Sequence, residues 1–387
     1  MIPYGRQSID QSDIDAVVAV LTSDYLTQGP AVPRFERAVA AAAVATHAVA
    51  VSSATAALHL ACKALGVGPG DRVWTSAITF VASSNCALYC GADVDFIDID
   101  PATYNMSVAA LSERLVEAKR SGRLPKVVIP VHLAGQSCDM RAIHALSQEF
   151  GFRIVEDASH AIGASYLDEP VGSCRYSDIT VFSFHPVKIV TTAEGGVAVT
   201  HDAELAARMD LLRSHGITRD PALMVSQPHG GWYYEQIALG FHYRMTELQA
   251  ALGASQMTRL HEFVARRRAL AARYDQLLAD LPVVLPCQDP TTSSSWHLYV
   301  LRLQRPEHIE RHAEIFARLR EMGIGVNLHY IPVYTQPYYR QLGFEPGHCP
   351  EAEKYYSSAI SIPLYADLGE ADQDEVVRAL TSCLAAV

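Results

Sequence analysis

The sequence predicts an α/β protein with a large domain built on a central, mostly parallel sheet and a smaller C-terminal α+β domain. Short apolar runs alternate with helical patterns through the first two-thirds of the chain, as in a sheet covered by helices. These runs are continuously apolar, which favours strands buried on both faces. After about Met245 this alternation stops, so we place the domain division between residues 1–245 and 246–387.

The candidate strands of the large domain are the continuous apolar runs Ala48–Val51, Arg72–Ser76, Val94–Ile99, Lys126–Val131, Arg153–Asp157, Ile179–Phe184 and Gly196–Thr200. Between them, Ala54–Leu65 and Met140–Phe150 have helical periodicity. Gly66–Gly70 follows a helix and leads into a strand. Since a dinucleotide loop has the reverse order, we interpret this segment as a simple turn.

The C-terminal part begins with one long helical stretch, Thr246–Leu281. Its charge run Arg266–Arg268 is expected on a solvated helix face. Ser295–Leu303, a helix, Gly325–Val333 and a closing helix follow, and together they indicate a smaller α+β domain.

Composition excludes several classes of function. The chain has 31 Lys and Arg against 42 Asp and Glu, a net charge of −11, so a nucleic-acid partner is not expected. No run of eighteen apolar residues and no signal-peptide pattern is present, which predicts a cytoplasmic protein without a membrane partner. The eight cysteines form no CxxC pair, and without HExxH or a Cys/His cluster we expect no catalytic metal.

Lys188 is the first candidate site residue. The chain has few lysines, and Lys188 alone lies just after an apolar strand, within the weakly charged stretch Phe182–Gly196. A lysine in an apolar pocket loses proton affinity and becomes a neutral amine nucleophile. The alternative is a lysine that extends from a loop into solvent.

Asp157 is the second candidate, because it ends the strand before the one that precedes Lys188. Ligands of open α/β sheets bind at the carboxyl ends of strands. Pyridoxal phosphate needs a Schiff-base lysine and a carboxylate that keeps its pyridine nitrogen protonated. Considered alone, an aspartate in this position is more often a capping or turn residue.

The stretch Ala48–Leu60 has the order strand, small polar turn, helix. Free amides at such a helix start hold phosphate groups, and Ala54 lets the backbone approach closely. Thr55 and Ser183 offer hydroxyls. Helix capping by Ser or Thr explains the same residues and is compatible with a phosphate site.

Seven motifs stand out along the chain: Leu26–Glu36, Ser52–Ala61, Ser76–Asn85, Glu156–Ala164, Phe182–Gly196, Arg213–Ile217 and Gly240–Gly253. Together, and over essentially the whole chain, they resemble the fold-type-I, pyridoxal-phosphate-dependent nucleotide-sugar aminotransferases of the DegT type. Within that family, the chain looks most similar to enzymes of pseudaminic acid biosynthesis, on the stretches Ile2–Ile9, Phe182–Lys188, His329–Phe344 and Glu351–Tyr365. The resemblance implies conversion of a UDP-linked 4-keto-6-deoxy-N-acetyl-hexose to its 4-amino sugar, with glutamate as amino donor.

The resemblance also implies residue roles. Lys188 forms the Schiff base and shuttles a proton, and Asp157 pairs with the pyridinium nitrogen. The remaining cofactor contacts are His160 near the phenolic oxygen, Phe80 stacked on the ring, and Ala54, Thr55 and Ser183 at the phosphate. The nucleotide-sugar cleft is expected to be lined by Tyr4, Leu26, Thr27, His329 and Tyr330.

His242 departs from the family pattern, because relatives carry Asn in this GFHYR stretch. In relatives that Asn reaches the cofactor phosphate of the neighbouring subunit, which implies a homodimer with shared active sites. Imidazole also donates a hydrogen bond, so His242 is expected to replace Asn. A purely structural histidine is the alternative.

Three other functions stay open at this point. One is amination of another UDP- or dTDP-keto-sugar, at C3 or C4. Another is a sensor of the cofactor or of a nucleotide sugar that lacks turnover. The third is a sugar dehydratase of the same fold, but such relatives replace the Schiff-base lysine with histidine, and Lys188 argues against it.

Overall fold

The computed structural model describes residues 1–386 and contains a central seven-stranded sheet. Its spatial order is β1 (His47–Val51), β9 (Gly196–Thr200), β8 (Ile179–Ser183), β5 (Arg153–Asp157), β4 (Val127–Ile129), β2 (Arg72–Ser76) and β3 (Asp93–Ile97). From β8 to β3 all neighbours are parallel, whereas β9 runs antiparallel to both β8 and β1. The predicted α/β class with a mostly parallel sheet is therefore confirmed, and each candidate strand forms part of this sheet.

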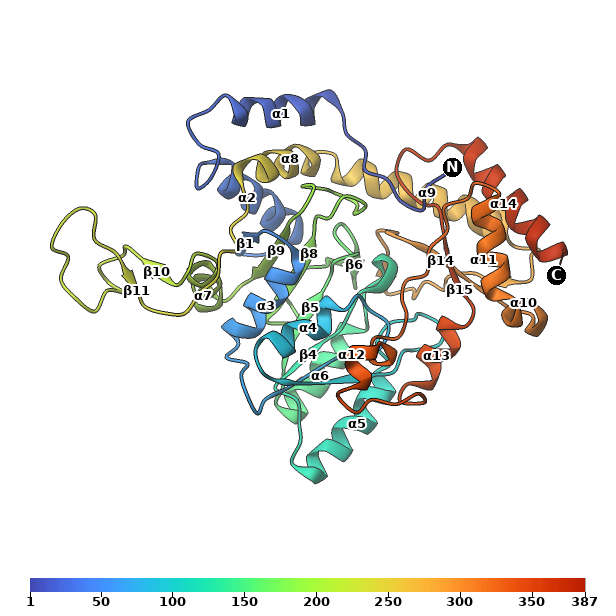
Figure 1. Cartoon of the computed structure of the whole chain (residues 1–387), viewed down its shortest axis with the longest axis horizontal. Coiled ribbons are helices and arrows are strands. Elements are labelled where there is room, and N and C mark those ends of the chain that lie inside the picture. The colour runs from blue at the N-terminus through green and yellow to red at the C-terminus, as the bar shows by residue number, and fades with distance from the viewer. Residues whose placement is uncertain (387) are drawn as a thin grey trace.

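The strands are apolar throughout because helices cover both faces of the sheet (Figure 1). Successive side chains alternate between the faces. Val73 packs in one cluster with α3 (Ala54–Ala64), α4 (Ala82–Tyr89) and α7 (Ala203–Arg213), while Trp74 packs in another with α5 (Val108–Ser121) and α6 (Met140–Phe150). Burial on both faces thus explains the continuous apolar runs.

The predicted helix Thr246–Leu281 is two helices, α8 (Glu247–Met257) and α9 (Leu260–Leu277). The break coincides with Arg259, whose Nη2 pairs with the buried Asp13 Oδ2 at 2.5 Å. Asp13 belongs to α1 (Gln11–Leu21), and α8 packs against both α1 and α2 (Ala31–Ala43). The domain division at residues 245 and 246 stays a prediction.

The expectation that Arg266–Arg268 lies on a solvated face is wrong for Arg267. Its side chain is buried, and its Nη1 donates to three backbone carbonyls, those of Trp296, His297 and Leu364, at 3.0–3.2 Å. Burial lowers the pKa of this guanidinium to about 10. Arg267 therefore joins α9 to the segments that follow it.

The C-terminal part contains a second, three-stranded antiparallel sheet of β12 (Val283–Val284), β14 (Tyr299–Leu303) and β15 (Ala359–Ile362). Gly325–Val333, which we expected to contribute an element, forms no strand of this sheet. It has only an isolated bridge between Asn327 and Ser361. The physical reason is its position, because several of its side chains line a cavity instead of pairing with a sheet edge.

Helices of the C-terminal part pack on this sheet around one apolar cluster. They are α9, α11 (His312–Glu321) and α14 (Glu370–Ala385). The shorter helical elements are α10 (Pro306–Glu310), α12 (Pro337–Arg340), α13 (Pro350–Tyr356), η1 (Leu133–Gly135) and η2 (Val333–Thr335). Among residues 1–386, no helix is both long and apolar enough to cross a membrane.

Two small sheets complete the fold. One joins β13 (Thr292–Ser293), β6 (Ser165–Tyr166) and β7 (Glu169–Pro170). The other pairs β10 (Ile217–Thr218) with β11 (Glu235–Gln236), and Figure 1 shows this hairpin as an arm that projects from the body.

Candidate active site

A cavity of about 620 Å³ lies where β5 and β8 end and α3 begins. Its size is in the range of small-molecule sites. Its lining includes ten of the predicted site residues: Tyr4, Ala54, Thr55, Phe80, Asp157, His160, Ser183, Lys188, His329 and Tyr330. The fold thus brings together residues from both ends of the chain.

Lys188 lies in the loop after β8, and its side chain reaches into the cavity. Its Nζ has no hydrogen-bond or ion-pair partner among residues 1–386. Burial lowers the pKa of this amine to about 7, although the nearby Asp157 carboxylate acts in the opposite direction. A large fraction of Lys188 is therefore a neutral amine near pH 7, as a nucleophile requires.

Asp157, the last residue of β5, is held on both carboxylate oxygens. The Ser83 hydroxyl donates to Oδ2 at 2.6 Å, and the Ser159 amide donates to Oδ1 at 3.1 Å. Ser83 lies on α4 and is itself within 2.7 Å of the Thr79 hydroxyl. The carboxylate therefore has a fixed orientation at the cavity wall.

The start of α3 forms a cradle for an anion. Ser53 caps the helix by accepting from Ala56 N, whereas the amides of Ala54 and Thr55 have no acceptor among residues 1–386. A Cβ on Gly196 would lie 2.5 Å from Ala54 N, so only glycine permits this close approach of β9. Free amides at a helix N-terminus suit a phosphate group.

His160 and Tyr330 contact each other in the lining of the cavity. The Ala134 amide donates to His160 Nδ1 at 3.2 Å, and His160 Nε2 lies 3.2 Å from the Tyr330 hydroxyl. Burial, with the charge of Lys188, holds the pKa of His160 well below its ordinary value. His160 is therefore neutral, and its proton lies on Nε2, the nitrogen that faces Tyr330.

Phe80 is 57% exposed, and its ring centroid lies 6.2 Å from that of Tyr330. One face of the ring is therefore available to a flat ligand in the cavity.

Tyr4 and His329 lie on the side of the C-terminal part, with ring centroids 5.2 Å apart. Asn327 Nδ2 is 3.4 Å from His329 Nε2, and His329 Nδ1 is 2.9 Å from the Ser361 hydroxyl. Burial, with the charge of Lys188, lowers the pKa of His329 to about 3, so the ring is neutral. This wall offers uncharged hydrogen-bonding groups.

Sequence reasoning missed other residues of the cavity wall, among them Asn327 and His297. His297 is buried, its Nδ1 has no partner within the described chain, and its ring lies 4.4 Å from that of His160. His297 is in a stretch with the pattern of a strand, and no sequence signal shows that it faces His160.

Three predicted site residues do not line this cavity within one chain: Leu26, Thr27 and His242. The carbonyl of Leu26 accepts from Glu247 N at 3.1 Å, which holds the loop at the start of α8 instead. His242 is exposed and its ring stacks on that of His215, with centroids 5.2 Å apart. The expectation that Leu26 and Thr27 join Tyr4 and His329 in one wall is therefore not met within a single chain.

A second cavity, of about 590 Å³, lies next to these residues. Gln28 and Gly29 line it together with His215, Arg219 and Arg244. The Nε of Arg244 is buried without an acceptor in the described residues. This cavity is thus rich in cationic groups.

Comparison with known proteins identifies the family of this chain. The sequence profile of the DegT/DnrJ/EryC1/StrS aminotransferase family matches residues 7–381. The chain belongs to this family. It is 40% identical over 382 residues to the spore coat polysaccharide biosynthesis protein SpsC of Bacillus subtilis, covering 98% of this chain and 96% of SpsC.

Solved structures agree with the DegT family assignment. Helicobacter pylori PseC, an aminotransferase involved in the biosynthesis of pseudoaminic acid, superposes with a TM-score of 0.91 at 30% identity, over 100% of both chains. The putative sugar aminotransferase Spr1654 of Streptococcus pneumoniae, in its PMP form, gives 0.90 at 30% identity, also over 100% of both chains. The protein is accordingly a sugar aminotransferase of the DegT family.

Pyridoxal phosphate is the cofactor of DegT aminotransferases, and the cavity fits it. Lys188 offers an unpartnered amine, and Asp157 offers a fixed carboxylate. The unpartnered amides of Ala54 and Thr55 offer donors for a phosphate. The cavity therefore presents groups that fit the cofactor's aldehyde, ring nitrogen and phosphate.

Proposed function

We propose that this protein converts a UDP-linked 4-keto-6-deoxy-N-acetyl-hexose to its 4-amino sugar, with glutamate as amino donor, in pseudaminic acid biosynthesis. The observation that carries the proposal is the convergence of Lys188, Asp157 and the α3 amides on one cavity. The likeness to H. pylori PseC over the whole chain supports the choice of sugar.

Pyridoxal phosphate, when bound, withdraws electrons from the substrate carbon that carries the nitrogen. Asp157 is then placed to keep a proton on the pyridine nitrogen by its negative charge. Ser83 and Ser159 hold that carboxylate in position. Lys188 Nζ, neutral in a large fraction near pH 7, acts first as the nucleophile and then as the base that moves a proton.

The neutral wall opposite Lys188 suits a sugar. His329 and Asn327 present groups that donate or accept hydrogen bonds without net charge, and Tyr4 adds a hydroxyl. Hydroxyl and amide groups of an N-acetyl sugar are matched by such partners. We therefore assign substrate contacts to Tyr4, His329 and Tyr330.

We further propose a homodimer in which Leu26, Thr27 and His242 serve the active site of the neighbouring subunit. All three lie away from the cavity of their own chain. His242 neighbours the cationic second cavity, which is lined by Arg219 and Arg244. A cofactor phosphate from a second copy would supply the anion that this surface lacks.

The sugar assignment is tested with purified holoenzyme, glutamate and a panel of UDP- and dTDP-linked sugars that carry a 3-keto or a 4-keto group. Mass spectrometry should detect an amino sugar, one nitrogen richer, with the UDP-linked 4-keto-6-deoxy-N-acetyl substrate. Efficient amination of only a dTDP-linked or 3-keto sugar would refute the proposed substrate while leaving the aminotransferase family unaffected. Replacing glutamate by aspartate or glutamine in parallel reactions tests the donor.

A further inference from the structure

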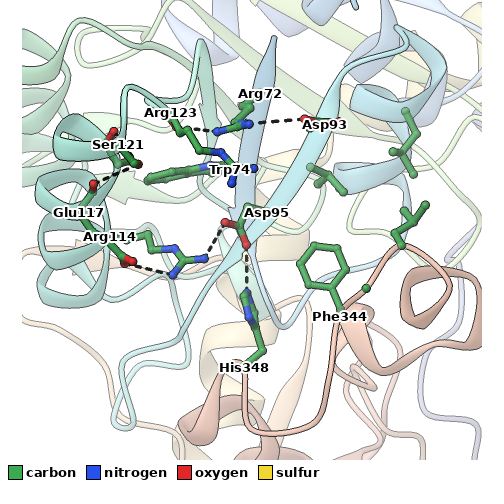
Figure 2. Close-up of a pocket in the computed structure, with 15 residues that line it drawn as sticks. Arg72, Trp74, Asp93, Asp95, Arg114, Glu117, Ser121, Arg123, Phe344 and His348 are labelled. Atoms are coloured by element: carbon green, nitrogen blue, oxygen red, sulfur yellow. Dashed lines mark hydrogen bonds and ion pairs between the residues drawn. The ribbon is translucent and has the colours of Figure 1, made fainter. Parts of the chain in front are cut away.

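A third cavity, of about 490 Å³, lies at the β3 edge of the central sheet (Figure 2). The residues that form it come from β2, β3, α4, α5, the segment between α5 and β4, and the loop between α12 and α13. None of them lines the cavity that holds Lys188. This cavity is therefore separate from the active site.

Three arginines and three carboxylates line this edge cavity. Arg114 has close ion-pair partners among these carboxylates, whereas Arg72 and Arg123 do not. Arg114 Nη2 lies 2.9 Å from Asp95 Oδ2 and its Nη1 lies 3.3 Å from Glu117. His348 Nε2 lies 3.0 Å from the other carboxylate oxygen of Asp95, Oδ1. Figure 2 shows Arg114 and His348 converging on Asp95 from different elements.

Both carboxylate oxygens of Asp95 thus have partners within the protein. Burial alone would raise the pKa of this carboxyl, but hydrogen bonds from His348 and Arg114 hold the pKa below its ordinary value. Asp95 is ionised at neutral pH, and the Arg114 guanidinium balances its charge. Asp95 does not neutralise the remaining arginines.

The guanidiniums of Arg72 and Arg123 have few or no hydrogen-bond partners among residues 1–386. The side chain of Arg72 is only 21% exposed, and its Nε is 3.7 Å from Asp93 Oδ2, beyond hydrogen-bond distance. Its Nη1 makes one long bond, 3.4 Å, to the backbone carbonyl of Arg123. The Arg123 guanidinium has no hydrogen-bond or ion-pair partner among residues 1–386. Among residues 1–386, two guanidiniums with free donors therefore face one cavity, that of the partly buried Arg72 and that of Arg123, which is exposed to solvent.

The rest of the wall is apolar and partly aromatic. Trp74 is 2% exposed, and its indole Nε1 has no acceptor within the described chain. Leu88, Val94 and Phe344 line the same space. A ligand of this cavity therefore needs an apolar body as well as a charged group.

We propose that this edge cavity is a second ligand site, which binds a small organic acid with a phosphate or carboxylate group on a flat apolar body. The acidic group accepts from Arg72 and Arg123, and the apolar body lies against Leu88, Val94 and Phe344. A planar guanidinium fork matches both phosphate and carboxylate oxygens. The assignment does not depend on which sugar the enzyme aminates.

Isothermal titration calorimetry of the holoenzyme with phenyl phosphate tests this site. We expect saturable binding that weakens about tenfold or more in Arg123→Met and in Arg72→Met, because each variant removes a charged donor. Arg120→Met is the matched control. Arg120 lies in the last turn of α5 and does not line the cavity, so its loss should leave the dissociation constant unchanged.

Two further probes separate the parts of the proposal. Inorganic phosphate should bind at least tenfold more weakly than phenyl phosphate, and equal affinity would overturn the apolar part. Benzoate should also bind through Arg123, whereas phenol, which lacks the charge, should not. A wild-type dissociation constant for phenyl phosphate in Arg123→Met and Arg72→Met, or an equal loss in Arg120→Met, would overturn the site.

Discussion

The hydroxyl of Ser83 donates a 2.6 Å hydrogen bond to Oδ2 of Asp157. Ser83 is on α4 and Asp157 ends β5, so the bond joins a helix to a strand end across the cavity wall. Thr79, 2.7 Å from the same hydroxyl, extends the contact into a short chain. Ser83 is therefore a positioning residue for the carboxylate that we assign to the cofactor's ring nitrogen.

Removing that bond should reduce activity without unfolding the protein. We expect Ser83→Ala to lower kcat roughly tenfold to a hundredfold, because a hydrogen bond to a charged group contributes about 1.5–3 kcal/mol. Ser83→Thr keeps the hydroxyl and should retain most of the activity. Steady-state kinetics at saturating cofactor would detect the difference, and an alanine variant as fast as wild type would refute the positioning role.

Asp157→Asn tests the carboxylate itself. An amide of the same shape cannot hold a proton on the ring nitrogen by charge, so we expect kcat to fall on the order of 10²–10³-fold, by analogy with other preorganised electrostatic groups. The thermal unfolding midpoint serves as the control for fold. An unchanged kcat at saturating cofactor would show that another group holds the pyridinium proton.

His242 tests the shared active site. If His242 donates to the cofactor phosphate of the neighbouring subunit, His242→Ala should weaken cofactor binding roughly tenfold to a hundredfold. His242→Asn should largely restore it, because the amide is also a donor. Cofactor dissociation constants decide the matter: wild-type affinity in the alanine variant would contradict the cross-subunit contact.

The lowered pKa of Lys188 predicts how cofactor capture depends on pH. Since the pKa is about 7, the neutral amine dominates above that value and is lost as the pH falls. The rate at which apoprotein regains visible absorbance should rise about tenfold between pH 6 and 8 and then level off. An ordinary lysine would give a rate that rises steadily through this range and beyond, and that result would contradict a lowered pKa.

Much of the large domain could be predicted from sequence because its strands are buried on both faces. Continuous apolar runs arise from that burial, and Val73 and Trp74 illustrate it by packing against opposite helix layers. Lys188 and Asp157 were also predictable, since the carboxyl ends of neighbouring parallel strands meet at one edge. Both do line the same cavity.

Contacts between distant segments could not be predicted. From its charge, Arg267 was expected to be exposed to solvent. No local sequence pattern reveals the backbone carbonyls that accept hydrogen bonds from its guanidinium in the interior. His297 and Asn327 enter the cavity from the C-terminal part, and only the folded arrangement places them there. Leu26 and His242 lie outside the cavity of their own chain, so the roles that we propose for them require a second copy.

The central claim is that amino transfer from glutamate to the sugar requires the Lys188 amine as nucleophile and base. The direct measurement is mass spectrometry of the sugar product formed by Lys188→Ala holoenzyme, with Lys354→Ala as the matched variant of an exposed lysine that is paired with Glu351. The account predicts no amino sugar from Lys188→Ala and normal product from Lys354→Ala. Full turnover to the amino sugar by Lys188→Ala would contradict it.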